Sequence, residues 1–212
     1  MNVRGYYFIT DSGYSEQGVV NDIAVALDCG VQIVQYRDKN KSTRERLREA
    51  EKAVQLCRRY GALLIVNDSV EIAGAIGADG VNVGANDLPP ELAFRILGAG
   101  AIVGVSVSTL ADVEEAVRAG ATYLGAGPIA ATPTKKDAAA PTGLGLLAEI
   151  KRRTPVPVAA IGGITFENAA EVLAAGADLI CSISAVYRAP SLKEGIRKMM
   201  MLYADYGQEE KR

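Results

Sequence analysis

The tetrapeptide Gly77-Ala-Asp-Gly80 recurs almost unchanged twice more along the chain, as Gly120-Ala-Thr-Tyr123 and Gly176-Ala-Asp-Leu179. Each copy follows an amphipathic helical pattern and leads into a short apolar run. Glycine just past a helix end readily adopts the left-handed conformation that turns the chain back. The three copies therefore mark returns from a helix to the next strand, and they indicate one strand–helix unit that repeats.

Short apolar runs extend this unit over the whole chain. Most of them are continuous rather than alternating in polarity, which is typical of parallel strands buried on both faces. The predicted strands are Tyr6–Thr10, Ile33–Arg37, Leu63–Asn67, Gly80–Val83, Ile102–Val107, Tyr123–Gly127, Val158–Gly162 and Leu179–Ser184. The predicted helices are Glu16–Cys29, Ser42–Tyr60, Ser69–Ile76, Pro89–Leu97, Thr109–Ala119, Leu144–Arg153, Phe166–Ala175 and Leu192–Tyr206.

Eight such units in 212 residues predict an α/β fold, the (β/α)8 TIM barrel. The alternative is a doubly wound open sheet, but eight regular units without a switch in pattern favour closure. No linker, low-complexity segment or break in composition interrupts the chain, so we expect a single barrel domain over residues 1–212.

The composition narrows the chemistry that the chain can perform. There is no histidine, so imidazole can serve neither as acid or base nor as a metal ligand. Carboxylates for a hard metal ion remain, with lysine, arginine, hydroxyls and backbone amides for phosphate. The net charge is −2, from 23 basic and 25 acidic residues, so a nucleic-acid partner is not expected.

The cysteines and the apolar runs bear on the compartment. Cys29, Cys57 and Cys181 are odd in number and widely spaced, which is typical of reduced thiols rather than of a zinc site. We see no signal peptide, and no run approaches the roughly 18 apolar residues of a membrane span. We therefore expect a cytoplasmic protein without a membrane partner. Its oligomeric state stays open, a homodimer included.

Two aspartates stand where the third and fourth strands end. In barrels of this kind the reacting groups gather at the carboxyl ends of the strands, and Asp68 and Asp87 follow two neighbouring ones. Mg²⁺ prefers oxygen ligands and commonly takes one or two carboxylates plus substrate phosphates. Each aspartate could instead cap the helix that follows it. The phosphate-binding residues beside them favour an Mg²⁺ site.

Cations and hydroxyls lie at the same ends. Arg37, Lys39 and Lys135 can hold phosphate oxygens, and Thr132 and Thr134 add hydroxyl donors. These residues and the aspartates predict a metal-assisted anion site.

A second anion site, without a metal, is predicted after the seventh and eighth strands. Gly162-Gly163 precedes Thr165 and a helix predicted to open at Phe166, and Ser184 could complete the site. Backbone amides and a helix N-terminus bind anions in this way. We expect two small phosphorylated substrates, one of them a diphosphate whose departing pyrophosphate Mg²⁺ would neutralise.

The motifs at these positions, taken in order, resemble those of the thiamine phosphate synthase family. They are Gln35-Tyr-Arg-Asp-Lys39, Val66-Asn-Asp68, Gly77-Ala-Asp-Gly-Val81, Asn86-Asp-Leu-Pro89, Gly104-Val-Ser106, Gly125-Ala-Gly-Pro128, Thr132-Pro-Thr-Lys-Lys-Asp137, Ala160-Ile-Gly-Gly-Ile164 and Ile183-Ser-Ala185. Each motif alone is weak, but the ordered set is specific and covers almost the whole chain.

The resemblance implies a role in thiamine biosynthesis, namely condensation of hydroxymethylpyrimidine diphosphate with thiazole phosphate to thiamine phosphate and pyrophosphate. It implies that the pyrophosphate leaves first and that the thiazole nitrogen captures the resulting pyrimidine carbocation. It also implies Mg²⁺ on Asp68 and Asp87, with Ser106 and Lys135 as candidate catalytic residues beside the reacting groups. The implied pyrimidine diphosphate ligands are Gln35, Arg37, Lys39, Asn67 and Lys135. The implied thiazole phosphate ligands are Thr132, Thr134, Gly163, Ile183 and Ser184.

The chain departs from the family pattern at three places. Asn82 stands where a histidine is usual, and Ala85 stands where a glutamine usually precedes the metal-binding aspartate. We expect altered contacts around the site rather than loss of the chemistry. Ala130-Ala131 replaces a bulkier pair, which could enlarge the thiazole pocket.

Three other functions are compatible with such a barrel. The related thiazole tautomerase uses a histidine near the end of the fifth strand, where this chain has Ser108, a poor base at neutral pH. A barrel that only binds a phosphorylated ligand is the second alternative. A phosphate-binding isomerase is the third, and the paired aspartates argue against it.

Overall fold

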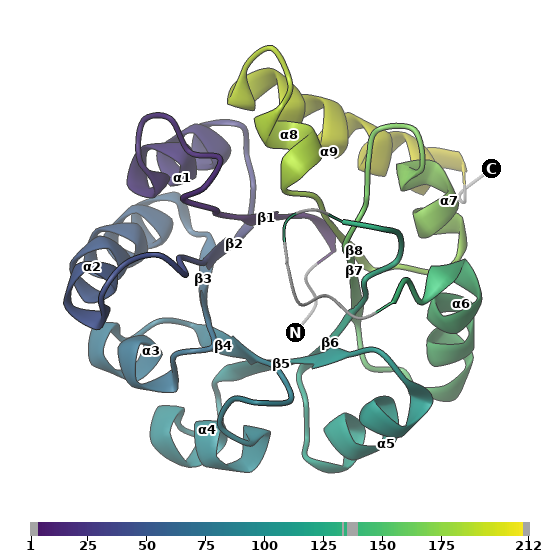
Figure 1. The fold of residues 1–212 in the computed structure, drawn as a ribbon, viewed down its shortest axis with the longest axis horizontal. Coiled ribbons are helices and arrows are strands. Elements are labelled where there is room, and N and C mark those ends of the chain that lie inside the picture. Colours follow the sequence, from purple (N-terminus) through teal and green to yellow (C-terminus); the bar gives the residue numbers. More distant parts are fainter. Residues whose placement is uncertain (1–3, 133, 135–139, 210–212) are drawn as a thin grey trace.

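The structure, a computed structural model, describes residues 4–132, 134 and 140–209. Eight parallel strands close into a barrel in chain order, with β8 paired to β1, and helices surround it (Figure 1). The predicted (β/α)8 barrel is therefore confirmed, and the open sheet is not what forms.

The strands match the predicted ones to within a few residues. They are β1 (Gly5–Ile9), β2 (Ile33–Tyr36), β3 (Leu63–Asn67), β4 (Gly80–Val83), β5 (Ile102–Val107), β6 (Tyr123–Ala126), β7 (Val158–Ile161) and β8 (Leu179–Cys181). The helices are α1 (Val19–Asp28), α2 (Thr43–Tyr60), α3 (Val70–Ile76), α4 (Pro90–Leu97), α5 (Leu110–Arg118), α6 (Gly143–Arg153), α7 (Ala169–Ala174), α8 (Ser184–Tyr187) and α9 (Leu192–Glu209).

Two boundaries near the end of the chain differ from prediction. The last strand ends at Cys181 rather than Ser184, because the Ser182 hydroxyl donates to the Ile164 carbonyl at 2.7 Å and the chain turns into the short helix α8. Helix α7 begins at Ala169 rather than Phe166. The Thr165 amide instead donates to the Asn168 side chain at 2.8 Å, within a turn.

The recurring tetrapeptide ties helices to strands in a way that its sequence explains. Its glycines, Gly77, Gly120 and Gly176, have positive φ angles of 62°, 83° and 101°. The alanine that follows each one donates its amide to a carbonyl five residues back, as Ala78 does to Ala73 at 2.9 Å. This bond closes the last turn of the helix in the manner of a Schellman motif.

The third residue of each copy holds the start of the neighbouring strand. A side-chain oxygen of Asp79 accepts from the Leu64 amide at 2.8 Å, and Thr122 and Asp178 do the same for Val103 at 3.0 Å and Val158 at 2.9 Å. These bonds satisfy strand-end amides on β3, β5 and β7. The repeated tetrapeptide therefore supplies hydrogen bonds that hold the amino ends of these strands.

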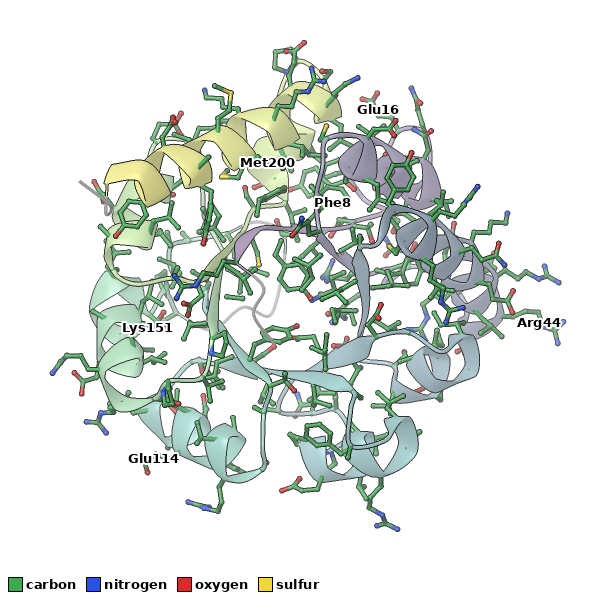
Figure 2. The ribbon with its side chains drawn as sticks, turned by 180° about the vertical axis from the view of Figure 1, so that it is seen from behind. Phe8, Glu16, Arg44, Glu114, Lys151 and Met200 are labelled. Carbon is green, nitrogen blue, oxygen red and sulfur yellow. The ribbon has the colours of Figure 1, made fainter. Side chains whose placement is uncertain are left out.

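The core has two apolar layers, and the alternation along β1 separates them. Tyr7 and Ile9 face the interior of the barrel, whereas Tyr6 and Phe8 face the surrounding helices. Burying such a side chain completely contributes roughly 2 kcal/mol. Outside this second layer, charged side chains such as Arg44 and Glu114 point away from the barrel (Figure 2).

The cysteines and the helices agree with the composition. Cys29, Cys57 and Cys181 are free, as predicted. Within the described ranges, no helix has the length and apolar character needed to cross a bilayer.

Candidate active site

A cavity of about 590 Å³ opens at the carboxyl ends of the strands. Twelve of the thirteen predicted site residues line it, while Lys135 lies outside the described part of the chain. The twelve are Gln35, Arg37, Lys39, Asn67, Asp68, Asp87, Ser106, Thr132, Thr134, Gly163, Ile183 and Ser184. The strand ends thus bring these residues to one place, and what each of them binds stays a prediction.

Arg37 follows β2 and is held by two residues that follow β1. Its guanidinium donates to a carboxylate oxygen of Asp11 at 2.5 Å. Its backbone amide donates to the Thr10 hydroxyl at 2.8 Å, and that hydroxyl donates to the Arg37 carbonyl at 3.0 Å. The Arg37 and Asp11 side chains are only 13% and 12% exposed, so water screens this ion pair less than a surface pair.

Neither Thr10 nor Asp11 was predicted from the sequence to be a site residue. Both directly follow the first strand, so the strand-end rule that selected the other residues would have found them.

Buried Asp38 fixes the loop on which Arg37 and Lys39 lie. Its carboxylate accepts from the Asn40 and Lys41 amides at 2.8 and 3.2 Å, and the Lys41 ammonium lies 3.2 Å away. Burial alone would raise the pKa of Asp38, but these hydrogen bonds and Lys41 outweigh burial and lower it. Asp38 thus anchors the loop on one side, and its two neighbours line the cavity.

Asp68 and Asp87 lie close together at the ends of β3 and β4. Burial, and after it the negative charge of Asp87, raises the pKa of Asp68, while Lys39 opposes the shift from 3.6 Å. Asp68 also has a positive φ of 62°, a conformation that aspartate and asparagine tolerate better than most residues. Such backbone strain often accompanies a functional site.

Neither aspartate is the N-cap of the helix after it. The N-cap residues of α3 and α4 are Ser69 and Pro89. One oxygen of Asp87 instead accepts from the Gly84 amide at 2.8 Å within the β4–α4 turn. Capping therefore does not account for the pair of acids.

The acid pair has the chemistry of a partial Mg²⁺ site. Two adjacent carboxylates whose repulsion raises a pKa are relieved by a divalent cation. In the part of the chain that the structure describes, no group of three or more His, Cys, Asp or Glu side chains is placed to hold a metal ion. A bound Mg²⁺ would thus need further oxygens from substrate and water, as Mg²⁺ sites commonly do.

The side of the cavity at the ends of β7 and β8, here called the neutral side, is formed largely by backbone. Gly162 and Gly163 follow β7 with φ angles of 90° and 68°. A Cβ on Gly163 would lie 2.7 Å from the backbone of Ala130 and Ala131, a distance that no real side chain adopts. The Asn168 side-chain nitrogen Nδ2 donates to the Gly163 carbonyl at 2.9 Å and fixes the turn. Because α7 starts later than predicted, its N-terminus does not directly follow these glycines.

The floor of the cavity is a chain of hydrogen-bonded side chains from five strands. Gln35 Nε2 donates to the Tyr7 hydroxyl at 2.9 Å, and the Tyr7 and Tyr123 hydroxyls are 3.0 Å apart. The Tyr123 hydroxyl donates to Asn82 Oδ1 at 2.9 Å, and Asn82 Nδ2 donates to Ser106 Oγ at 3.1 Å. In the sequence Asn82 stood out only as a departure from the family pattern, and neither tyrosine was predicted, since an interior tyrosine cannot be told from a core residue by pattern.

Ser108, at the end of β5, belongs to a helix cap. Its amide and its hydroxyl both bond to Asp112 Oδ2, at 2.8 and 3.1 Å. Asp112 also closes the capping box of α5 with Thr109. This residue therefore has a structural partner of its own.

Comparisons with known proteins extend over the whole barrel. Residues 6–186 match the family model described as thiamine monophosphate synthase. A thiamine-phosphate synthase of Chloroflexus aurantiacus is 46% identical over 197 residues, covering 92% of this chain and 91% of that protein. Another, from Methanosarcina barkeri, is 45% identical over 184 residues, covering 85% and 82%. The solved thiamine phosphate pyrophosphorylase from Pyrococcus furiosus superposes with a TM-score of 0.88 at 37% identity, covering 97% of this chain and 98% of that one.

Proposed function

The chain belongs to the thiamine monophosphate synthase family, and on that premise we propose that it is a transferase that forms thiamine phosphate. Its substrates are 4-amino-5-hydroxymethyl-2-methylpyrimidine diphosphate and thiazole phosphate, and its second product is pyrophosphate. The observation that supports the proposal is that the described residues of both predicted anion sites, the charged one and the backbone one, line a single cavity.

The diphosphate binds on the side of the cavity that carries Arg37, Lys39 and Asn67. Arg37 meets its oxygens from an orientation that Asp11 fixes, and Lys39 adds a point charge. Asp68 and Asp87 hold Mg²⁺, which supplies positive charge to the leaving group when it is bound. Lys135 joins them by resemblance to the family.

The thiazole phosphate binds on the opposite side, at Gly163, Ile183 and Ser184, with the hydroxyls of Thr132 and Thr134. With both substrates seated, the carbon–oxygen bond to pyrophosphate breaks first and the thiazole nitrogen captures the pyrimidine cation. Positioning and charge stabilisation drive such a reaction, and no strong base is required. A chain without histidine can therefore perform it.

The tautomerase alternative requires a base near the end of β5. Ser108 occupies that place with its hydroxyl bonded to Asp112, as part of the α5 cap. No observation favours this alternative over the synthase.

Incubation with both substrates, with and without EDTA, tests the proposal. We expect thiamine phosphate and pyrophosphate in the untreated sample and a large loss of both with EDTA. Absence of product in both samples would refute the synthase activity. Equal product in both would refute the dependence on a metal ion.

A further inference from the structure

The hydrogen-bonded chain under the cavity has a single direction. The Tyr123 proton is committed to Asn82 Oδ1, so the bond between the two tyrosines takes its proton from Tyr7. Gln35 donates to Tyr7, and Asn82 donates to Ser106. Every bond thus points from β2 towards β5, and no member can reverse alone without leaving a neighbour unpaired.

The direction decides what the two ends offer to a ligand. The Gln35 amide nitrogen faces Tyr7 and gives it one of its two hydrogens, which fixes the amide orientation and leaves the carbonyl oxygen available as an acceptor. Ser106 accepts from Asn82, so its hydroxyl proton is available as a donor. Both residues line the cavity. The floor therefore presents an acceptor on the β2 side and a donor on the β5 side.

The barrel is shaped to keep this chain in place. Tyr123 and Tyr7 are each 1% exposed, with rings nearly perpendicular and centroids 6.0 Å apart. Gly104 pairs with Tyr123 across β5 and β6, and a Cβ there would overlap the Tyr123 ring. Burial also raises the pKa of both tyrosines above their ordinary value, so both hydroxyls stay protonated near neutral pH.

We propose that Tyr7, Tyr123 and Asn82 are positioning residues that set substrate specificity by fixing the orientation of the Gln35 amide and the Ser106 hydroxyl. The inference rests on the proposed function and deepens it. The preferred ring carries a hydrogen-bond donor towards Gln35 and an acceptor towards Ser106, as an aminopyrimidine does. A ring with an oxo group in place of the amino group opposes two acceptors at Gln35.

The test compares kcat/KM for the aminopyrimidine diphosphate and for its oxo analogue, each with saturating thiazole phosphate. A site built to bond a polar group rejects its mismatch strongly, so we expect the wild-type protein to prefer the amino substrate by on the order of 10³-fold or more. In Tyr123→Phe, Tyr7 loses its acceptor and can donate to Gln35 instead, which frees the amide to rotate. We expect the preference to fall at least about 10-fold.

Tyr6→Phe is the matched control. Tyr6 neighbours Tyr7 on β1 and is also buried, but its hydroxyl donates to the Ser182 carbonyl on the helix-facing side. We expect this variant to keep the wild-type ratio. A Tyr123→Phe variant that is slower on both substrates by the same factor, with an unchanged ratio, would overturn the proposal.

Asn82→Asp tests the other end of the chain. The introduced carboxylate still accepts from Tyr123 but cannot donate, so the Ser106 proton turns towards it and away from the ligand. We expect a lower ratio here as well, and the wild-type ratio would again overturn the proposal. If the wild-type protein makes no thiamine phosphate at all, the proposed function fails; if it is active but the variants keep its ratio, only the positioning role fails.

Discussion

The two sides of the cavity offer an anion opposite kinds of binding group. The side at β2–β4 uses charged side chains that are paired with one another, Arg37 with Asp11 and Lys39 with Asp68. The side at β7–β8 uses glycine turns and serine, and none of its described cavity-lining residues from Gly162 to Ile164 or from Cys181 to Ser184 is charged.

The contrast between paired charges and glycine turns indicates which changes should affect ligand binding on each side. Charged pairs that already neutralise one another separate only for a ligand that replaces the lost partner, which in the proposed reaction is a diphosphate together with a cation. A backbone turn has no such competitor, but it depends on the shape of the main chain. Substrate binding at the charged side should therefore depend on metal and pH, and binding at the neutral side should depend on steric changes in the backbone turn.

The largest effect is expected at the acid pair. Asp68→Asn and Asp87→Asn should each lower kcat/KM by about 10²–10³-fold, a typical loss when a transition-state charge partner is removed. Asparagine suits the positive φ of Asp68 and removes the repulsion, so the thermal unfolding midpoint should not fall. Asp28→Asn, on the outer surface, is the control for loss of one charge. An acid-pair variant that unfolds instead would mark that aspartate as structural.

Adding a single methyl group at Gly163 should be enough to weaken binding at the neutral side. Gly163→Ala should raise KM for thiazole phosphate by about 10- to 100-fold, because overpacking costs roughly 1–3 kcal/mol, while the Mg²⁺ requirement stays the same. Gly143→Ala is the matched control, since Gly143 also has a positive φ of 73° but open space around its Cβ. Equal effects of the two substitutions on KM would show that close packing at Gly163 plays no part.

Asp11→Asn should separate the two sides more finely. Without its charged partner, Arg37 is less well oriented, and KM for the pyrimidine diphosphate should rise about 10-fold, the value of one charge-assisted hydrogen bond. KM for thiazole phosphate should stay unchanged in the same kinetic assay. A lower KM for the diphosphate would mean that Asp11 competes with substrate for Arg37.

The smallest effect is expected from pH. Burial and Asp87 raise the pKa of Asp68, so a proton competes with Mg²⁺ at a higher pH than at an ordinary aspartate. Mg²⁺ affinity, measured by calorimetric titration, should weaken as pH falls through this raised value. The free energy of unfolding without metal should show the opposite pH dependence. The folded state binds the Asp68 proton more tightly than the unfolded state does, so this contribution to stability is present at low pH and lost as pH rises through the folded pKa. In Asp68→Asn the pH dependence that comes from Asp68 should vanish both from the Mg²⁺ affinity and from the free energy of unfolding.

The sequence contained most of the fold and most of the site. Continuous apolar runs gave eight strands, and the rule that chemistry follows strand ends brought Asp68, Asp87 and Gly163 to one cavity. Helix α8 was missed because four residues carry no helical period, and the start of α7 was misplaced because the turn depends on the Asn168 side chain.

The floor of the cavity could not be predicted in the same way. Tyr7 and Tyr123 are 116 positions apart in the chain, and only the closed barrel brings their hydroxyls together. Asp11 is a different kind of miss, because its position directly after β1 was readable from the sequence.

The hydrogen bonds that Asp79, Thr122 and Asp178 make lie at the amino ends of the strands, whereas the acid pair, Arg37, Lys39 and the Gly162-Gly163 turn lie at the carboxyl ends. The bonds that hold these strand ends and the predicted charged and glycine groups of the site thus lie at opposite ends of the barrel. The loops at the carboxyl ends could therefore be replaced by those of another enzyme while these three bonds at the amino ends are kept, which makes this small barrel a useful scaffold for protein design.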